Sequence, residues 1–271
     1  MTAGTVVTFV QARLGSTRLP GKVLLPLAGR PALLLQLERL RAARLVGTIV
    51  VATTTDPADD PIESLASVHG FACFRGHPTD LLDRHVAAAR AFGARYVVKI
   101  PSDCPVIDPR VVDRVLGRFL SPAWRFDYVS NLHPATWPDG NDVEIMTFEA
   151  LETAWREAPP GFHREHTTPF LWDQPGRFRI GNVAWETGRD LSLSHRFTLD
   201  YAEDHAFLAA VCDALAPRGP LFPLEEILAL LERRPELPRI NARHAGANWY
   251  WRHLAELRTV PSRATRRPES A

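Results

Sequence analysis

The sequence predicts an α/β fold in which a mainly parallel sheet carries helices on both faces. In residues 1–120, short runs rich in Val, Ile and Thr alternate with longer segments of helical periodicity. Such alternation is typical of parallel β-α-β units, whose helices cover both faces of the sheet.

The individual elements follow from local composition. In the first half, β-branched apolar runs predict strands at residues 5–10, 47–54, 71–76 and 95–100. Helical spacing predicts helices at residues 31–45, 61–70, 80–93 and 109–120. Pro31 suits a first helical turn, while Gly70 and Gly93 suit helix ends. In the second half, the looser pattern predicts strands at 127–131, 142–148, 177–185 and 195–200, and helices at 147–158, 201–215 and within 220–237.

The chain of 271 residues has neither an internal repeat nor a long linker, so we expect a single domain over residues 1–257. Residues 258–271 lack an apolar pattern and are expected to form a disordered tail.

Composition excludes several classes of protein. The net charge of +1 argues against a general nucleic-acid binder, which usually has a basic excess. No apolar run approaches the roughly 18 residues of a membrane helix, and the N-terminus lacks a secretory pattern. The cysteines Cys73, Cys104 and Cys212 have no paired spacing. We therefore expect a cytoplasmic protein without membrane or nucleic-acid partners.

The stretch "QARLGSTRLPGK", residues 11–22, directly follows the first predicted strand. It contains two glycines and three cations: Gly15, Gly21, Arg13, Arg18 and Lys22. Ligands of open parallel sheets bind at the carboxyl ends of strands, and such a loop can surround a triphosphate with backbone N–H groups and fixed charge. Lys22 is followed by Val23, so this is no Walker A loop, and the G-x-G-x-x-G spacing is absent. A solvated basic turn is the alternative interpretation.

This opening closely resembles that of nucleotide-sugar cytidylyltransferases of the spore-coat polysaccharide biosynthesis protein F type, with CMP-KDO and CMP-sialic acid synthetases as more distant kin. The resemblance continues through "KIPSDCPVIDP", "DGNDVEIMTFEAL", "REHTTPF" and "FTLDYAEDHAFL" and covers about residues 5–215. It implies a glycosyltransferase-A-like (Rossmann-like), mixed, mainly parallel sheet. The nucleotide-binding half would span about residues 1–120 and the acceptor-binding half about 121–257.

The resemblance also implies an activity. A Mg²⁺-dependent enzyme would transfer CMP from CTP to a sugar or sugar acid, release pyrophosphate and serve surface polysaccharide synthesis. A homodimer is plausible from such relatives. Two alternatives remain: a glycosyltransferase of the same fold that uses a nucleotide sugar, and a non-catalytic nucleotide-binding regulator or scaffold.

Within the opening loop, the resemblance assigns the phosphates to Arg13, Ser16, Arg18 and Lys22, and the base or ribose to Gln11 and Ala12. Arg13 and Lys22 would neutralise the leaving pyrophosphate. Gly15 would let the backbone approach the substrate closely.

Two aspartates are implied as Mg²⁺ ligands. Asp103 follows the strand at 95–100, and Asp200 ends the one at 195–200. Each has a structural alternative: Asp103 could serve a turn, and Asp200 could cap the next helix. Asp108, directly before Pro109, is expected to be a helix cap.

Further candidates lie on later strands and loops. Asp142 and Glu144 would share one side of a strand, where Asp142 could meet the acceptor or a cation; a solvated strand face is the alternative. By resemblance, Arg164 and His166 would bind an acidic sugar. Thr53 would line the base pocket.

Two remaining segments are harder to assign. By resemblance, Arg75 belongs to a segment that helps to select the nucleobase. The aromatic run at 249–251 lies among cations, and we interpret it as core packing or a subunit contact.

Overall fold

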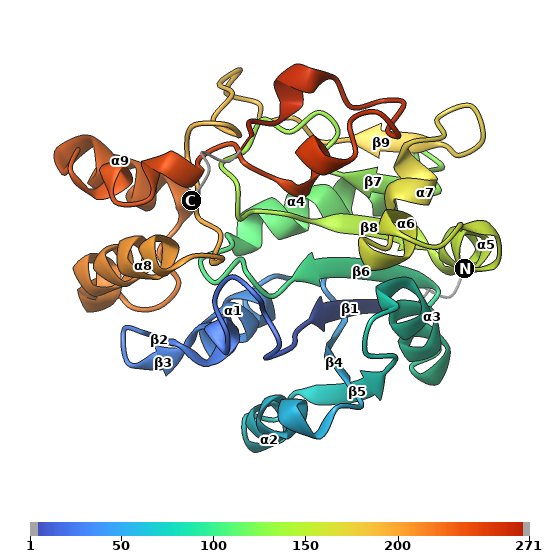
Figure 1. Ribbon diagram of the computed structural model, residues 1–271, viewed down its shortest axis with the longest axis horizontal. Coiled ribbons are helices and arrows are strands. Elements are labelled where there is room, and N and C mark those ends of the chain that lie inside the picture. Colours follow the sequence, from blue (N-terminus) through green and yellow to red (C-terminus); the bar gives the residue numbers. More distant parts are fainter. Residues whose placement is uncertain (1–4, 268–271) are drawn as a thin grey trace.

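The fold is built on one mixed sheet. The computed structural model describes residues 5–267, and within them seven strands are ordered β5-β4-β1-β6-β8-β7-β9 (Figure 1). Their bounds are β1 (Val6–Gln11), β4 (Thr48–Thr54), β5 (Ala72–Gly76), β6 (Tyr96–Pro101), β7 (Tyr128–Ser130), β8 (Glu144–Thr147) and β9 (Ile180–Asn182). β1, β4, β5 and β6 pair in parallel, and β8 runs antiparallel to both of its neighbours. The predicted mixed, mainly parallel sheet is confirmed.

Helices cover both faces because each strand alternates its apolar side chains. They are α1 (Ala32–Arg41), α2 (Asp60–Val68), α3 (Leu81–Ala91), α4 (Pro109–Leu120), α5 (Phe148–Glu157), α6 (Phe162–Glu165), α7 (Pro169–Trp172), α8 (Ala202–Leu215) and α9 (Leu224–Arg233). Val10 packs with α1, α2 and α4 on one face, whereas Phe9 packs with α3 and α5 on the other. Neither side chain is exposed to solvent.

A third apolar cluster lies beside the sheet. It joins α8 and α9 to a short hairpin, β2 (Pro26–Leu27) and β3 (Arg30–Pro31), which the sequence did not predict. Figure 1 shows α8 and α9 at one side of the sheet. The hairpin escaped prediction because each of its strands is only two residues long.

The strand predicted at 195–200 is wrong. This segment makes one isolated bridge, between Arg196 and Asp139, and is otherwise irregular. Gly140 permits this close approach, since a Cβ there would lie 2.7 Å from the carbonyl carbon of Phe197. The segment therefore serves to place polar side chains.

The tail prediction is wrong for residues 258–267, and residues 268–271 lie outside the described residues. The Asp173 carboxylate accepts hydrogen bonds from the backbone N–H groups of Arg258 (2.9 Å) and Thr259 (2.7 Å). The Arg266 N–H donates to the Gly246 carbonyl at 2.8 Å. Polar anchoring by distant residues thus replaces the apolar periodicity that this segment lacks.

The helices within residues 5–267 include none that combines the length and apolarity needed to cross a membrane.

His85 of α3 gives the fold a defined sensitivity to acid. Its side chain is fully buried, and burial lowers its pKa to about 3 from 6.5. The unfolded chain takes up this proton below about pH 6.5, so its contribution to stability is complete above that pH and is lost as pH falls. We expect His85→Phe to reduce the pH slope of the unfolding free energy by about 1.4 kcal/mol per unit between pH 4 and 6. Urea unfolding across this range measures the slope, with the exposed His69→Gln as control.

Candidate active site

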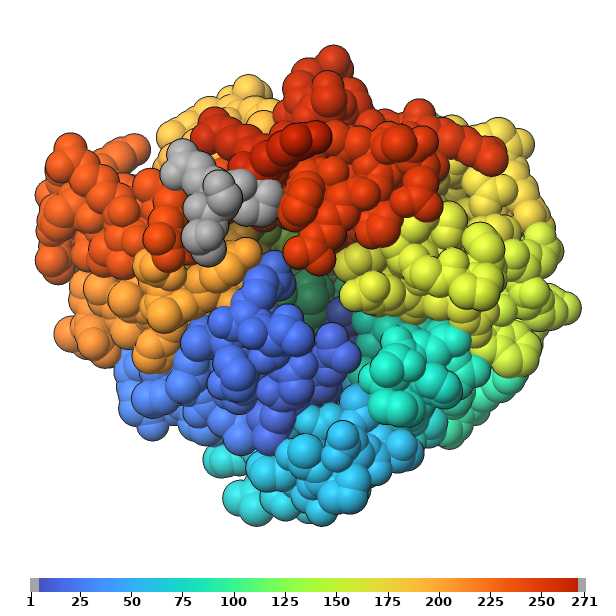
Figure 2. Space-filling view, in the orientation of Figure 1, coloured from blue at the N-terminus to red at the C-terminus, as the bar shows by residue number. Residues whose placement is uncertain are grey.

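A large cavity opens at the carboxyl ends of β1 and β6. Its volume is about 930 Å³, and its lining comes from segments within residues 11–18, 99–103, 131–144, 166–172, 190–200 and 246–264. Figure 2 shows a hollow bordered by the blue N-terminal residues, the red C-terminal segment and the yellow-green segment. Both predicted halves therefore contribute to one site.

Lys22 joins the two aspartates that were predicted to bind metal. Its Nζ lies 2.8 Å from Asp200 Oδ1 and 3.5 Å from Asp103 Oδ2. Arg18 also donates to Asp200 Oδ1, at 2.6 Å. Burial alone would raise the pKa of Asp200, but Lys22, Arg18 and Arg196 outweigh it and lower that pKa to about 2. The structure thus brings together residues that lie far apart in the sequence.

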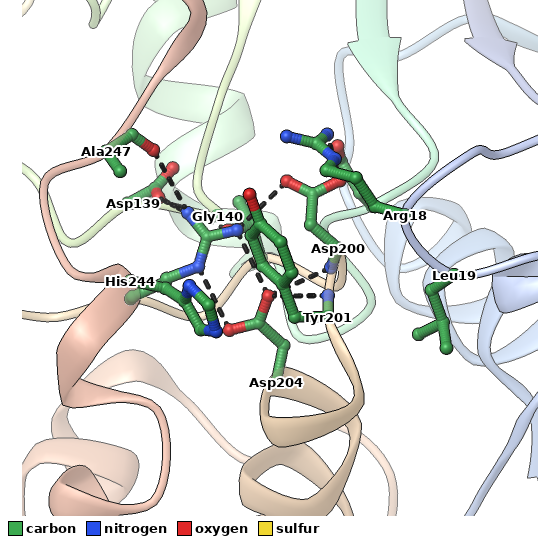
Figure 3. Close-up of polar contacts among 12 residues, drawn as sticks. Arg18, Leu19, Asp139, Gly140, Asp200, Tyr201, Asp204, His244 and Ala247 are labelled. Carbon is green, nitrogen blue, oxygen red and sulfur yellow. Dashed lines mark hydrogen bonds and ion pairs between the residues drawn. The ribbon is translucent and has the colours of Figure 1, made fainter. Parts of the chain in front are cut away.

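Arg196, which sequence reasoning missed, organises this cluster. Its buried guanidinium donates to Asp200 Oδ2 (2.9 Å), to Asp204 (3.0 Å) and to Asp139 (3.2 Å). Figure 3 shows these three carboxylates turned toward one centre, with Ala247 of the C-terminal segment beside Asp139. A buried arginine with several carboxylate partners orients all of them.

The alternative role for Asp200 as a helix cap is excluded. Tyr201 is the N-cap of α8, and Asp204 accepts from the Tyr201 N–H at 3.0 Å. Asp108, in contrast, caps α4 by accepting from the Arg110 N–H at 2.8 Å, as expected.

Two further carboxylates lie on the floor of the cavity. Asp139 has its pKa raised to about 6 by burial, and burial with the charge of Asp139 raises that of Asp142 well above its usual range. Within residues 5–267, Asp142 has no ion pair and accepts only from the Gly140 N–H, at 3.3 Å. Burial therefore disfavours the ionised forms of both carboxyl groups, and the described residues do not fully compensate for it.

This charge distribution fits a divalent cation. Residues 5–267 contain no gathered group of three His, Cys, Asp or Glu that could hold a metal alone. Mg²⁺ commonly takes one or two carboxylates and completes its shell with phosphate oxygens and water. Asp103 and Asp200 can supply that pair, and a cation nearby would stabilise the ionised forms of Asp139 and Asp142, which burial disfavours.

The opening loop is anchored at its start and has free polar groups. The Leu14 N–H donates to Asp59 at 2.7 Å, and Ala12 is buried with its N–H on the Ala52 carbonyl. Gln11 lines the cavity, and its buried Oε1 has no hydrogen-bond partner within residues 5–267. A ligand amino or hydroxyl group could satisfy this atom.

The remaining loop residues differ in their surroundings. Arg13 is exposed and close enough to Arg84 that it adds to burial in lowering the pKa of Arg84 to about 10. Ser16 Oγ accepts from the Leu19 N–H at 3.3 Å. Gly21 adopts φ +70°, whereas a Cβ at Gly15 would meet nothing within 4 Å. Gly15 thus leaves open space beside the loop.

Six of the ten predicted substrate-binding residues lie outside the cavity lining: Ala12, Gly15, Ser16, Thr53, Arg75 and Arg164. Arg13 and Lys22, predicted to neutralise the pyrophosphate, also lie outside it. Arg75 donates to Asp60 at 2.6 Å and to the Thr54 carbonyl at 2.9 Å. Arg164 pairs with Asp80, and Thr53 is buried in β4. Arg75 and Arg164 form ion pairs that join neighbouring elements, away from the cavity lining.

The far wall of the cavity is aromatic. Trp249 stacks on His166 with ring centroids 3.9 Å apart, and Tyr250 lies beside Trp172. Lys99 and Glu144 form a buried ion pair on the floor beneath. His166 therefore lines the cavity, and its binding of an acidic sugar stays a prediction. Trp249 and Tyr250 contribute cavity wall as well as packing. The clustering of Trp and Tyr was its sequence signal.

The fold and the site define an α/β nucleotidyltransferase, in which a basic loop faces two carboxylates, one of them just after the end of β6. A model of the cytidylyltransferase family matches residues 7–241, and the chain belongs to this family. The predicted resemblance is thus confirmed. The segment 242–267, which supplies much of the aromatic wall, lies beyond the matched residues.

Individual members of the family are similar to this chain over most of its length. The spore coat polysaccharide biosynthesis protein SpsF of Bacillus subtilis is 28% identical over 236 residues, covering 85% of this chain and 95% of that protein. The 3-deoxy-manno-octulosonate cytidylyltransferase of Geobacter sulfurreducens is 32% identical over 210 residues, covering 73% and 76%. The solved structure of a cytidylyltransferase from Leptospira borgpetersenii has a TM-score of 0.82 at 31% identity, covering 87% of this chain and 97% of that one.

Proposed function

We propose that this cytidylyltransferase transfers CMP from CTP to a hydroxyl group of a sugar or sugar acid, with release of pyrophosphate. The observation that carries the proposal is one cavity in which a cationic loop, paired carboxylates and an aromatic wall meet. The product would be an activated sugar for surface polysaccharide, in line with the names of SpsF and the 3-deoxy-manno-octulosonate enzyme.

The nucleotide would lie across residues 11–22. Gln11 Oε1 is available to the base or ribose. Arg18 lines the cavity, and Lys22 lies behind the lining on Asp200, from where both would turn to phosphate oxygens. Cations at these positions stabilise the charge that develops on the departing pyrophosphate. Arg13 would add charge from the exposed side of the same loop.

Asp103 and Asp200 would hold Mg²⁺, which polarises the phosphate under attack and orients it for in-line displacement. Arg196 would keep Asp200 in place from behind, through its 2.9 Å contact with Oδ2.

The acceptor would occupy the other half of the cavity. Carboxylates on the floor accept hydrogen bonds from sugar hydroxyl groups, and the faces of Trp249 and Tyr250 offer apolar surface to the ring. Asp142 would take the proton of the attacking hydroxyl once a nearby cation has ionised its carboxyl group, whose pKa burial raises above that of an ordinary aspartate.

The deciding experiment is a pyrophosphate-release assay that crosses the four NTPs and Mg²⁺ with a panel of sugar acids and amino sugars. Release that requires both CTP and one acceptor is expected. A glycosyltransferase would consume a nucleotide sugar without releasing pyrophosphate from CTP. Binding of CTP without release in any combination would favour the regulator or scaffold.

Lys22 is expected to contact the distal phosphates of CTP, which CMP lacks. Lys22→Met should weaken binding of CTP about tenfold more than binding of CMP, because a charge-assisted contact to phosphate is lost only in the triphosphate. Calorimetric titration with both nucleotides measures this difference. Equal losses for CTP and CMP would show that Lys22 does not contact the distal phosphates.

A further inference from the structure

The two carboxylates assigned to the divalent cation, Asp103 and Asp200, form ion pairs with side chains of the opening loop. Asp200 Oδ1 accepts from Lys22 Nζ at 2.8 Å and from Arg18 Nη2 at 2.6 Å. Lys22 Nζ also lies 3.5 Å from Asp103 Oδ2. The ammonium group thus lies between the two side chains that a metal would bridge.

We propose that Lys22 and Arg18 are internal counter-ions of the metal site, which exchange these carboxylates for CTP phosphates when the nucleotide binds. The inference rests on the proposed function, since it takes CTP and a divalent cation as ligands of this site. Lys22 would thus pair first with the two carboxylates and then with the CTP phosphates. This exchange would make the nucleotide and the metal bind cooperatively.

The first reason for expecting cooperative binding is that a metal ion and Lys22 compete for the same carboxylate oxygen atoms. A metal that enters without nucleotide must displace an ammonium group that solvent hardly screens, because the Lys22 and Asp200 side chains are only 11% and 10% exposed. The metal alone should therefore bind weakly.

The loop can also make the exchange without opening the core. Its fixed points are the Leu14 N–H on Asp59 and the buried side chain of Val23. Between them, the Arg18 side chain is 50% exposed. Phosphate oxygens offer lysine and arginine strong charge-assisted hydrogen bonds in place of the carboxylates.

Once the cations have moved to the phosphates, Asp103 and Asp200 can bind the metal. Each ligand must then strengthen the binding of the other by the same factor. Couplings of this kind are commonly about 5–150-fold.

The first test measures Mn²⁺, a paramagnetic substitute for Mg²⁺, binding to the full-length protein without nucleotide. Electron paramagnetic resonance of free Mn²⁺ gives the affinity. We expect Lys22→Met to bind Mn²⁺ at least about tenfold more tightly than the wild type. Arg13→Met removes a cation of the same loop that contacts neither carboxylate within residues 5–267, and should leave the affinity unchanged. Adding Asp103→Asn to Lys22→Met should abolish the gain.

The second test measures the affinity for CTP in EDTA, which removes free metal ions. Asp103→Asn and Asp190→Asn each remove one negative charge from the lining of the same cavity, but within residues 5–267 only Asp103 of the two contacts Lys22. Calorimetry should show metal-free CTP binding tightened more by Asp103→Asn than by Asp190→Asn.

Two outcomes overturn the inference. One is a folded Lys22→Met protein, checked by circular dichroism, that binds Mn²⁺ no more tightly than the wild type. The other is an equal effect of Asp103→Asn and Asp190→Asn on the affinity for CTP. Neither readout uses turnover, so a missing pyrophosphate release would refute the proposed function separately.

Discussion

Asp103→Ala is expected to lower kcat by at least about a thousandfold while the protein stays folded. The side chain stands at the carboxyl end of β6, faces the cavity and is 25% exposed, so its loss creates no buried void. What disappears is one of the two carboxylates proposed to hold Mg²⁺ against the phosphate under attack. Steady-state pyrophosphate release with saturating CTP and acceptor measures the effect.

Asp103→Ala should disturb the structure little, so a loss of turnover can be assigned to the missing carboxylate. The Asp103 carbonyl that accepts from the Leu199 N–H at 2.8 Å is backbone and remains. Asp127→Ala is the matched control, because Asp127 pairs with Arg179 and does not line the cavity. Near-normal turnover of a folded Asp103→Ala protein would remove the metal assignment.

Arg196→Met is expected to cost about 3–5 kcal/mol of unfolding free energy, the range for removing one partner of a buried ionic group. The guanidinium is 3% exposed and contacts three carboxylates, of which Asp204 is fully buried. Without Arg196 these charges would lie close together with little solvent. Urea denaturation followed by circular dichroism measures the loss.

A surface ion pair provides the comparison. Arg179→Met breaks the pair with Asp127, where the arginine is 59% exposed, and should cost about 0–1 kcal/mol. If Arg196→Met were as mild as Arg179→Met, the cluster would not contribute to stability in the way that its burial indicates. Arg196→Lys should fall between them, since lysine keeps the charge but cannot reach three partners at once.

The alternation of β-branched runs and helical segments was enough to predict the sheet and most helices of the first half. These elements follow from local periodicity, because each strand and helix buries its own apolar face. The position of residues 11–22 after β1 was predictable for the same reason: parallel strands bring their carboxyl ends to one edge. The resemblance then supplied Asp103 and Asp200.

Pairing of charged side chains could not be predicted in this way. Arg75 and Arg164 look like substrate ligands in the sequence, yet each pairs with a carboxylate of a neighbouring element. Arg196 looks like one polar residue of a strand, yet it orients Asp139 and Asp200. An arginine has several donors, and which acceptors it meets depends on segments far away in the chain.

The sequence by itself therefore determined most of the first-half elements, the place of the loop at residues 11–22 and the family, because these depend on local periodicity and on a contiguous motif. Only the tertiary structure decided that Lys22 lies between Asp103 and Asp200, and that the segment 246–264 closes the cavity with Trp249. Those contacts join residues that are distant in sequence. Their geometry depends on how the C-terminal segment packs against the sheet and on which charged side chains then meet. No local sequence pattern encodes either.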